Sequence, residues 1–276
     1  MKKFLLGSVA LVALIGASPA MAADMAVKAP VVAPQFNWSG FYVGGHAGYG
    51  WGNADVTLVP GPGWALFGNP ATDPQYLIAN GSAALKSSGA LGGLQAGYNI
   101  QRANLVFGVE ADFSFADING NRNTGVVNPP PAAGIAPRNF TETDKLDWLA
   151  TVRGRVGLPV QNLLLYATGG WAVGHHAFSQ TIVFPGGPGN ANLGSVGGTK
   201  SGWTVGGGLE YALSRNWTAK AEYLYVDLGT VSAFADSTTA PGFGLSNVSS
   251  SKLTLNILRA GFNYKFDANG SVVAKY

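Results

Sequence analysis

The chain has 276 residues, no cysteine and a formal net charge of +3, and charged residues make up only 11 % of it. The near balance of charges and the lack of basic clusters interleaved with aromatics exclude nucleic acid as an expected partner, and the missing cysteines exclude a disulfide scaffold. Because ordinary soluble domains carry about 25 % charged residues, much of this protein's surface is expected to face something other than water.

The first 22 residues have the pattern of a secretory signal peptide. Lys2 and Lys3 form a basic start, an apolar stretch follows, and small residues surround the junction of Ala22 and Ala23. We therefore predict export and cleavage between Ala22 and Ala23. Residues 23–36 contain two prolines and no periodicity, which predicts an extended periplasmic linker.

Residues 37–276 contain eight stretches in which side chains alternate with a period of two, the pattern of β-strands. These stretches are Gly40–Trp51, Ala90–Gln101, Asn104–Ala116, Asp144–Leu158, Asn162–Gly174, Lys200–Leu213, Asn216–Thr230 and Leu253–Phe266. Their lengths suit strands that cross a bilayer at a tilt, which need about 9–11 residues. After the signal peptide, no apolar run reaches the roughly 18 residues of a membrane-spanning helix.

The connections between these stretches alternate strictly in length. The short ones lie at Arg102–Ala103, Pro159–Gln161 and Ser214–Arg215, and the long ones at residues 52–89, 117–143, 175–199 and 231–252. Short periplasmic turns and long extracellular loops are typical of outer-membrane barrels. We predict an all-β fold over residues 37–276, an eight-stranded antiparallel up-and-down transmembrane β-barrel with both termini in the periplasm.

The long tracts have a composition of their own. Residues 120–139 and 184–199, for example, are rich in Gly, Pro and Asn and hold few charges. We expect them to be exposed, mobile loops that contact host, phage or antibody, and the sequence names no particular ligand.

Sorting residues by the two-residue period places aromatic side chains on one face and charges on the other. In the seventh stretch, Trp217, Tyr223 and Tyr225 lie on one face, and Lys220 and Glu222 on the other. An apolar face with aromatic ends is typical of a surface in lipid, so the charges are predicted to point inward. The predicted interior network consists of Glu110, Asp112, Arg153, Arg155, Glu210, Lys220, Glu222, Arg259 and Lys265.

Eight strands enclose a space that side chains just fill, and a lone buried charge costs on the order of several kcal/mol. We therefore expect paired charges and a plugged interior rather than an open pore. The alternative is a soluble sheet with a solvated charged face and an aromatic core, which fits poorly with the signal peptide and the loop pattern. The fifth stretch, Asn162–Gly174, cannot be phased from its sequence.

Several segments carry a resemblance to a known family. They include "WSGFYVGGHAGYGWG" (38–52), "LVFGVEADFSFADI" (105–118), "TVRGRVG" (151–157), "KAEYLYVDLG" (220–229) and "LRAGFNYKF" (258–266). Together they resemble the small porin-like outer-membrane proteins of alphaproteobacteria, which include surface antigens and haem-binding proteins with an OmpA-like eight-stranded barrel. The resemblance implies an outer-membrane location, contact with lipid, lipopolysaccharide and the barrel-assembly machinery, and in some members haem binding or weak pore activity.

Two histidines raise the question of a haem or metal site. His175 and His176 lie where the fifth stretch ends, and imidazole is a common ligand. Adjacent residues of a strand point to opposite faces, however, so we favour a polar pair and expect no cofactor. Ser179 lies nearby, but no acid completes a catalytic group, so we expect no enzyme activity.

The end of the chain leaves the insertion signal open between Phe266, which closes the eighth stretch, and Tyr276, the last residue. We expect a non-catalytic structural and surface-interaction role in the bacterial envelope. A small passive diffusion channel and a haem-binding surface receptor are the alternatives. The oligomeric state does not follow from the sequence.

Overall fold

The computed structural model describes residues 36–67, 71–185, 191–238, 242–243 and 245–266. The predicted signal peptide, nearly all of the predicted linker and Tyr276 lie outside these residues. No helix in this part of the chain is long and apolar enough to cross a membrane.

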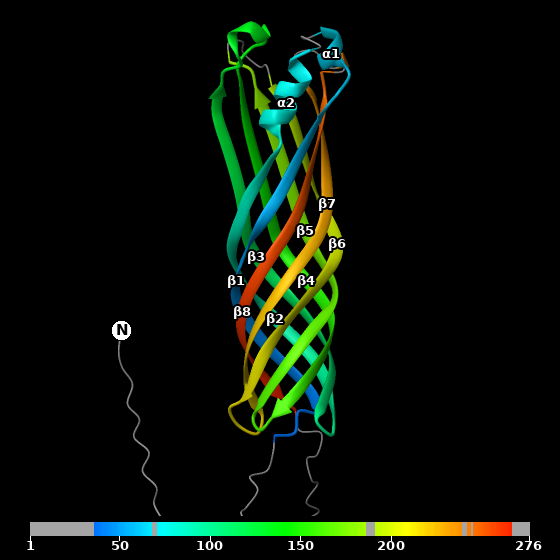
Figure 1. Cartoon of the computed structure of the whole chain (residues 1–276). Helices are drawn as coiled ribbons and strands as arrows, with labels where there is room; N and C mark the ends of the chain where they lie inside the picture. Colours follow the sequence, from blue (N-terminus) through cyan, green and yellow to red (C-terminus); the bar gives the residue numbers. More distant parts are fainter. Residues whose placement is uncertain (1–35, 68–70, 186–190, 239–241, 244, 267–276) are drawn as a thin grey trace, which may run out of the picture. The chain divides into compact units, whose positions relative to one another are not determined.

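Eight antiparallel strands form a closed barrel in chain order, and the last strand pairs with the first (Figure 1). The strands are β1 (Gly40–Pro60), β2 (Ala83–Arg102), β3 (Leu105–Val127), β4 (Arg138–Val160), β5 (Leu163–Val183), β6 (Ala191–Ala212), β7 (Trp217–Ser237) and β8 (Asn247–Lys265). Three short helices accompany them, namely α1 (Gly63–Phe67), α2 (Asp73–Gly81) and the 3-10 helix η1 (Pro131–Ala133). The predicted fold class is confirmed.

Three tight turns join strands at one end of the barrel. Ala103 and Gln161 have φ angles of +49° and +55° and occupy the first positions of the β2–β3 and β4–β5 turns. Positive φ is typical of two-residue hairpin turns whose twist matches that of the strands. The start of β1 and the end of β8 lie at this same end, which is therefore the periplasmic one (Figure 1).

The strands are much longer than the sequence predicts. β1 continues past Trp51 to Pro60, and strand pairing extends into both tracts that were expected to be mobile loops. Residues 120–127 belong to β3, and residues 191–199 belong to β6. The prediction of long irregular loops is wrong for these segments, because their backbones join the ladders of neighbouring strands.

The inner face of β1 consists of even-numbered residues throughout, but the apolar residues move from the outer to the inner face after Gly52. Below this level Phe41 and Trp51 point outward, whereas above it Ala54, Val56 and Leu58 point inward and are at most 4 % exposed. The extracellular part of the barrel therefore has an apolar interior. Its buried core consists of Ala54, Val56, Leu85, Leu91, Ile118, Leu146, Leu149, Ala172, Phe178, Leu224, Val226, Leu228, Val231, Ala233, Leu253, Leu255 and Ile257.

The outer wall carries two rings of exposed aromatics. The periplasmic ring includes Phe41, Tyr98, Phe107, Tyr211, Trp217 and Phe266, and the outer ring includes Trp51, Phe115, Trp171, Trp203 and Tyr223. The span from Phe41 to Trp51 rises about 26 Å at about 3.4 Å per residue and a tilt of about 40°. This height matches the apolar band of outer-membrane barrels, about 25 Å, so the rings mark the two faces of the membrane.

Candidate functional site: the filled barrel interior

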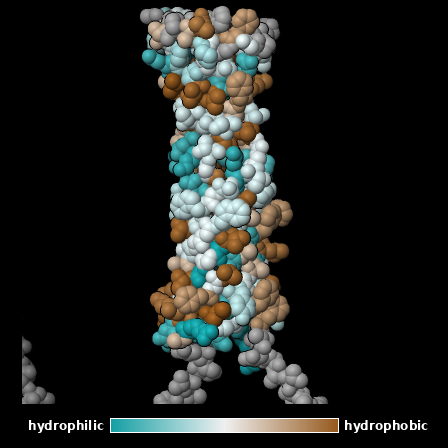
Figure 2. Space-filling model, turned by 90° about the vertical axis from the view of Figure 1, so that its right-hand side faces the viewer, coloured by the Kyte–Doolittle hydropathy of each residue, from teal (hydrophilic) through white to brown (hydrophobic). Residues whose placement is uncertain are grey.

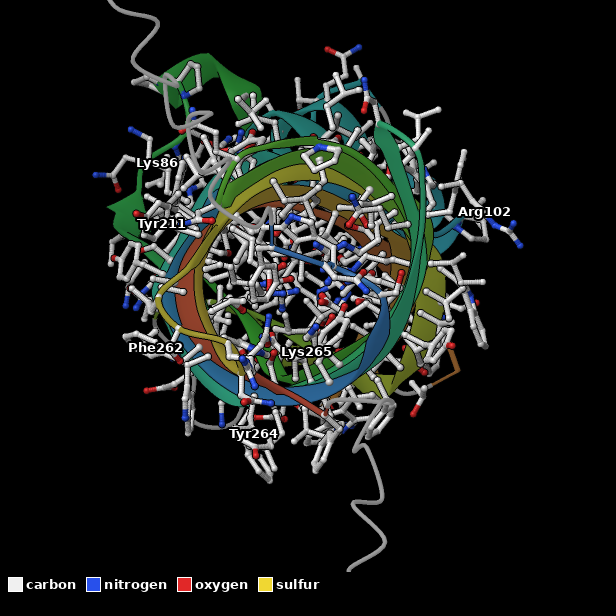
Figure 3. The ribbon with its side chains drawn as sticks, turned by 90° about the horizontal axis from the view of Figure 1, so that it is seen from below. Lys86, Arg102, Tyr211, Phe262, Tyr264 and Lys265 are labelled. Atoms are coloured by element: carbon white, nitrogen blue, oxygen red, sulfur yellow. The ribbon has the colours of Figure 1, made fainter. Side chains whose placement is uncertain are left out.

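A group of buried charges fills the membrane half of the barrel. Four acids and four bases from β3, β4, β6, β7 and β8 point inward, and each residue is at most 6 % exposed. The group consists of Glu110, Asp112, Arg153, Arg155, Glu210, Lys220, Glu222 and Arg259. Figure 3, seen from the periplasmic end, shows nitrogen- and oxygen-bearing side chains across the space within the strands.

Arg153 on β4 lies at the centre of the group. Its Nη2 is 2.6 Å from Glu110 Oε1 and 2.9 Å from Asp112 Oδ2, and its Nη1 is 2.9 Å from Glu222 Oε1. One guanidinium thus binds carboxylates from β3 and from β7. The planar fork of Arg donates along several directions at once, which a lysine in this place would not do.

The other three bases complete the network. Arg259 Nη2 is 2.6 Å from Glu222 Oε2, and its Nη1 is 3.0 Å from Asp112 Oδ1. Lys220 Nζ donates to Glu110 Oε1 at 2.8 Å, and Arg155 Nη2 donates to Glu210 Oε2 at 2.7 Å. All eight charges are therefore paired across the lumen.

Neutral side chains satisfy the remaining carboxylate oxygens. Tyr42 and Tyr166 donate their hydroxyls to Glu110 and Glu222 at 2.7 and 3.0 Å. Thr218 and Asn263 donate to Glu210. The sequence analysis identified neither Tyr166 nor Thr218, although Tyr166 faces the lumen from the fifth stretch, whose phase the sequence left open.

Glycine makes room for these side chains at one close approach. A Cβ atom on Gly97 of β2 would collide with the ring of Tyr42, whose hydroxyl donates a hydrogen bond to Glu110. Burying charges is costly, and removing one partner of a buried pair costs about 3–5 kcal/mol because the other charge stays unpaired. Removing any one charge of the network would therefore leave its partners buried and unpaired and would strongly destabilise the barrel.

Lys265 lies apart from the network, at the periplasmic end (Figure 3). Its Nζ donates to the carbonyl oxygen of Asn37 at 2.6 Å and lies 4.8 Å from the centre of the Phe36 ring. Next to them, Trp38 is only 2 % exposed, and its backbone N–H donates to Gln101 Oε1 at 2.9 Å. The residues just before β1 thus close the periplasmic mouth and leave a cavity of about 10 Å³.

A smaller polar group lies in the extracellular half. His176 Nε2 is 2.6 Å from Asp144 Oδ2, which also accepts a hydrogen bond from Ser251 at 2.8 Å. Glu142 is 0 % exposed as a side chain and accepts from Gln180 at 2.9 Å. Burial raises the pKa of the Glu142 carboxyl above its ordinary value, against the opposing influence of its hydrogen bonds.

The two candidate haem ligands lie on opposite sides of the wall. His176 points inward and is 0 % exposed, whereas His175 points outward and binds Asp147 at 2.9 Å. Ser179 pairs directly with Thr143 two positions above Lys145 on the outer face, so it does not meet His176. Among the described residues no group of three or more His, Cys, Asp or Glu is arranged to hold a metal ion.

The extracellular mouth is closed by α1, α2 and their neighbours. The guanidinium of Arg138 lies 5.0 Å from the Trp64 ring centre and 5.3 Å from those of Tyr76 and Phe184. Its Nη2 also binds Asp73 Oδ1 at 2.7 Å. Cation–π contacts of a desolvated Arg contribute about 2 kcal/mol or more, so this lid is a packed structure.

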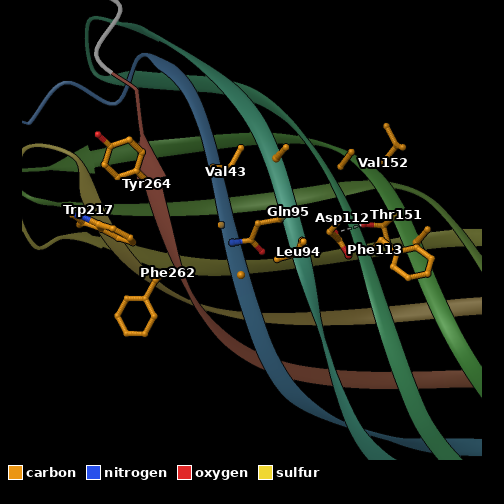
Figure 4. Close-up of a pocket in the computed structure, with 15 residues that line it drawn as sticks. Val43, Leu94, Gln95, Asp112, Phe113, Thr151, Val152, Trp217, Phe262 and Tyr264 are labelled. Carbon is orange, nitrogen blue, oxygen red and sulfur yellow. Dashed lines mark hydrogen bonds between the residues drawn. The ribbon is translucent and has the colours of Figure 1, made fainter.

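One wide groove lies on the outer wall of the barrel. It measures about 1070 Å³ and is lined by residues of β1, β2, β3, β4, β7 and β8. Figure 4 shows the side chains that line it. Its lining includes Val43, Leu94, Phe113, Trp217, Phe262 and Tyr264. Since these residues lie within the periplasmic ring or between the two aromatic rings, the groove is part of the lipid-facing surface.

Comparisons with known proteins agree with this geometry. A family model described as an outer membrane protein beta-barrel domain matches residues 9–266. A 31 kDa outer-membrane immunogenic protein of Brucella melitensis is 34 % identical over 273 residues, which cover 96 % of this chain and 100 % of the relative. A 25 kDa outer-membrane immunogenic protein of Brucella abortus is 27 % identical and covers 87 % of this chain and 85 % of its own. The outer membrane protein OprG of Pseudomonas aeruginosa, a solved structure, has a TM-score of 0.42 and 13 % identity, over 83 % of this chain and 97 % of OprG.

Proposed function

Because the chain belongs to the family of outer membrane proteins with a β-barrel domain, we propose that it is a non-catalytic envelope protein that seals its own lumen and interacts with other molecules through its extracellular half. Its location is the bacterial outer membrane.

The observation that supports a sealed barrel is the filling of the lumen at four successive levels. From the periplasm outward these are Trp38, the eight-charge network around Arg153, the apolar core and the lid around Arg138. A diffusion channel needs a continuous aqueous path, and eight strands leave just enough width for side chains. A sealed lumen leaves structural and surface roles as the functions of the barrel.

Single-channel conductance of the refolded protein in planar bilayers tests this proposal. Circular dichroism and heat-modifiable migration establish beforehand that the protein is folded and inserted. We expect no stable openings. Regular openings in folded protein would favour the alternative of a passive diffusion channel.

The surface role is supported by the height of the extracellular half. From Trp51 to Val59, β1 rises about 20 Å above the outer aromatic ring, at about 3.4 Å per residue and a tilt of about 40°. The Brucella relatives are named immunogenic outer-membrane proteins. A tall, exposed extracellular part is suited to contact with molecules outside the cell.

We also infer that lipids of the outer leaflet bind a belt of charged side chains just above the outer aromatic ring. Lys86, Lys145 and Lys252 are exposed there on β2, β4 and β8, next to outward acids such as Asp55. Lysines at this height suit the phosphates of lipopolysaccharide, and acids suit the cations between them. Replacing the three lysines by alanine is expected to reduce the rise in melting temperature on adding phosphorylated lipid A. An unchanged rise would contradict the inference.

A further inference from the structure

Pairing between β6 and β7 is interrupted in the extracellular half of the barrel. Trp203 pairs with Asp227 and Leu193 with Asp236, but residues 194–202 between them pair with β5 alone. Gly194 and Gly202 still lie against Ala235 and Asp227 of β7. Between them, the second edge of β6 presents backbone N–H and C=O groups without ladder partners over about 20 Å, at about 3.3 Å per residue. An open edge of this kind is a template for another strand.

The interruption has a local cause in β7. Gly229 has a φ angle of +71°, and its N–H donates to Asp227 Oδ1 at 2.8 Å. The register with β8 shifts by one residue between Asp227 and Thr230. Such a bulge bends a strand and ends its pairing, and β7 then approaches β5, where a Cβ on Gly174 would lie 3.2 Å from Leu228 Cδ1.

The open edge of β6 has few side chains that would prevent another strand from pairing with it. It contains four glycines, Gly194, Gly197, Gly198 and Gly202, and no proline. A Cβ atom on Gly198, which pairs with the inward His176, would meet no atom within 4 Å, so the inner face of the strand is uncovered at this position. Natural edges are commonly protected by charges, proline or short length, and here Lys200 is the one such device.

Lys200 is expected to favour strands that carry a carboxylate. It pairs with Gly174, whose position faces the lumen, and it is half-buried. No carboxylate of the described residues lies within 4.0 Å of its ammonium group. A strand added here would bury this ammonium further, and the cost is offset only when the strand supplies a carboxylate.

An exposed apolar patch lies beside the upper end of the edge. Val59 pairs with Val248 and Val248 with Phe234, and Leu193 lies next to Phe234 on β6. Phe234 is 64 % exposed, Val59 58 % and Leu193 56 %. Figure 2, which faces the right-hand side of Figure 1, shows an apolar zone near the extracellular end, separated by hydrophilic residues from the apolar side chains lower on the barrel.

Lipid does not cover this patch. It lies about 20 Å above the outer aromatic ring, and the charged belt that includes Asp55 and Lys252 lies between. Contiguous apolar surface in water is typical of protein-binding sites.

We propose that the open edge of β6 and this apolar patch form a docking site for an extended peptide segment of another protein outside the cell. The segment adds to β6 as a strand, packs an apolar side chain against Phe234 and Leu193, and pairs a carboxylate with Lys200. The proposal rests on the surface role proposed above but not on the sealed lumen, so conductance and peptide binding test the two separately.

A second copy of the chain does not fit the edge. Barrel strands are tilted by about 40° from the membrane normal. Two upright copies related by a twofold axis along the normal would therefore cross their β6 strands at about 80°, whereas strand pairing requires nearly parallel or antiparallel directions.

A synthetic peptide tests the proposal with the full chain in lipid nanodiscs. The probe is a fluorescent seven-residue strand of alternating polar and apolar residues, with a leucine at one end and a glutamate opposite Lys200. Two versions carry N-methyl groups on alternate amides, in one phase or the other. We expect saturable binding by fluorescence anisotropy, and a loss of at least about tenfold in affinity for at least one methylated version.

Protein variants locate the binding. Phe234→Asp is expected to weaken binding about tenfold, and Lys200→Glu about fivefold while improving binding of a peptide with lysine in place of the glutamate. Val126→Asp, on an exposed valine of β3 across the barrel, is the matched control and is expected to leave binding unchanged. The proposal is overturned if the parent peptide does not bind saturably, if both methylated versions bind as well as the parent, or if Phe234→Asp has no effect. It is equally overturned if the free protein forms dimers that Phe234→Asp dissociates, because a second copy then covers the patch.

Discussion

The membrane half and the extracellular half of the barrel share the same eight strands but bury opposite kinds of side chain. Below the outer aromatic ring, Arg153 and Glu110 are inside and Val109 is outside. Above it, Leu255 is inside and Lys252 is outside. The kind of side chain that a strand carries on its inner face thus depends on whether lipid or water surrounds the outer face, and a single strand shows both arrangements within about 20 residues.

The two interiors are stabilised by different interactions. In the membrane half, paired charges and hydrogen bonds fill the space. They stabilise the fold because no buried charge is left unpaired. In the extracellular half, apolar burial contributes about 25 cal/mol per Å² as in a water-soluble protein. Variants placed at matched positions in the two halves separate these contributions.

The largest expected effect is the loss of a central charge in the membrane half. Arg153→Ala leaves Glu110, Asp112 and Glu222 short of a partner and is expected to lower the free energy of unfolding by about 3–5 kcal/mol. Lys252→Ala removes a partly exposed ion pair with Asp227 in the extracellular half and is expected to change the free energy of unfolding by about 1 kcal/mol or less. Urea unfolding in lipid vesicles measures both. Equal losses would show that the inner charges are not coupled as described.

A cavity in the extracellular half comes next. Leu255 on β8 is 0 % exposed, and Leu255→Ala is expected to cost about 2–5 kcal/mol because the apolar core does not collapse into the space. On the same strand, Leu258 faces lipid and is 55 % exposed. Lipid chains fill the space that Leu258→Ala leaves, so that variant should lose less than half as much. A larger loss for Leu258→Ala would reverse the assignment of the two faces.

A charged residue introduced on the outer wall tests whether that position faces lipid or water. Val109 on β3 is 61 % exposed at the membrane level, and Val109→Arg is expected to cost about 2–4 kcal/mol. Asn121→Arg, further along the outer face of β3, lies above the outer ring and is expected to be neutral. Heat-modifiable migration and unfolding in vesicles measure the difference. Normal insertion and stability of Val109→Arg would contradict a lipid-facing position.

The smallest effect is a pH dependence in the extracellular half. Because burial raises the pKa of Glu142, the folded protein holds this proton more tightly than the unfolded chain does. Stability is therefore lost as pH rises from the ordinary range of a carboxyl through the raised pKa. Glu142→Gln is expected to remove this part of the slope of unfolding free energy against pH. An unchanged slope would show that Glu142 does not titrate during unfolding.

The sequence was sufficient to predict the membrane half, because there the two-residue alternation keeps one phase over a whole stretch. Lys220 and Glu222 are assigned to the inner face by parity alone. An odd or even position along a strand does not, however, reveal how high a residue lies along the barrel axis or where it lies around the barrel. That Arg155 binds Glu210 whereas Arg153 binds Glu222 depends on how far each strand is shifted against its neighbours.

The extracellular half could not be predicted in the same way. In β1 the apolar residues pass from odd-numbered to even-numbered positions after Gly52, and such an inverted hydrophobic pattern resembles the end of a strand. Residues 191–199 have almost no hydrophobic pattern, and their strand exists through pairing with β5. Trp38 enters the lumen from the segment before β1, a tertiary contact without any local signal. A search for alternation that resumes in the opposite phase would have found Ala54, Val56 and Leu58.

The central claim is that the apolar side chains move from the outer face of the strands to the inner face at the outer aromatic ring. Since the chain has no cysteine, a single cysteine placed along β1 gives a unique site for a spin label. Labels at outward positions 43, 47 and 51 and at 53, 55 and 57 are compared in vesicles by their collision rates with oxygen, which prefers lipid, and with a water-soluble nickel complex. The account predicts lipid exposure up to position 51 and water exposure from position 53 onward. Lipid exposure continuing to position 57, or water exposure already at position 47, would contradict it.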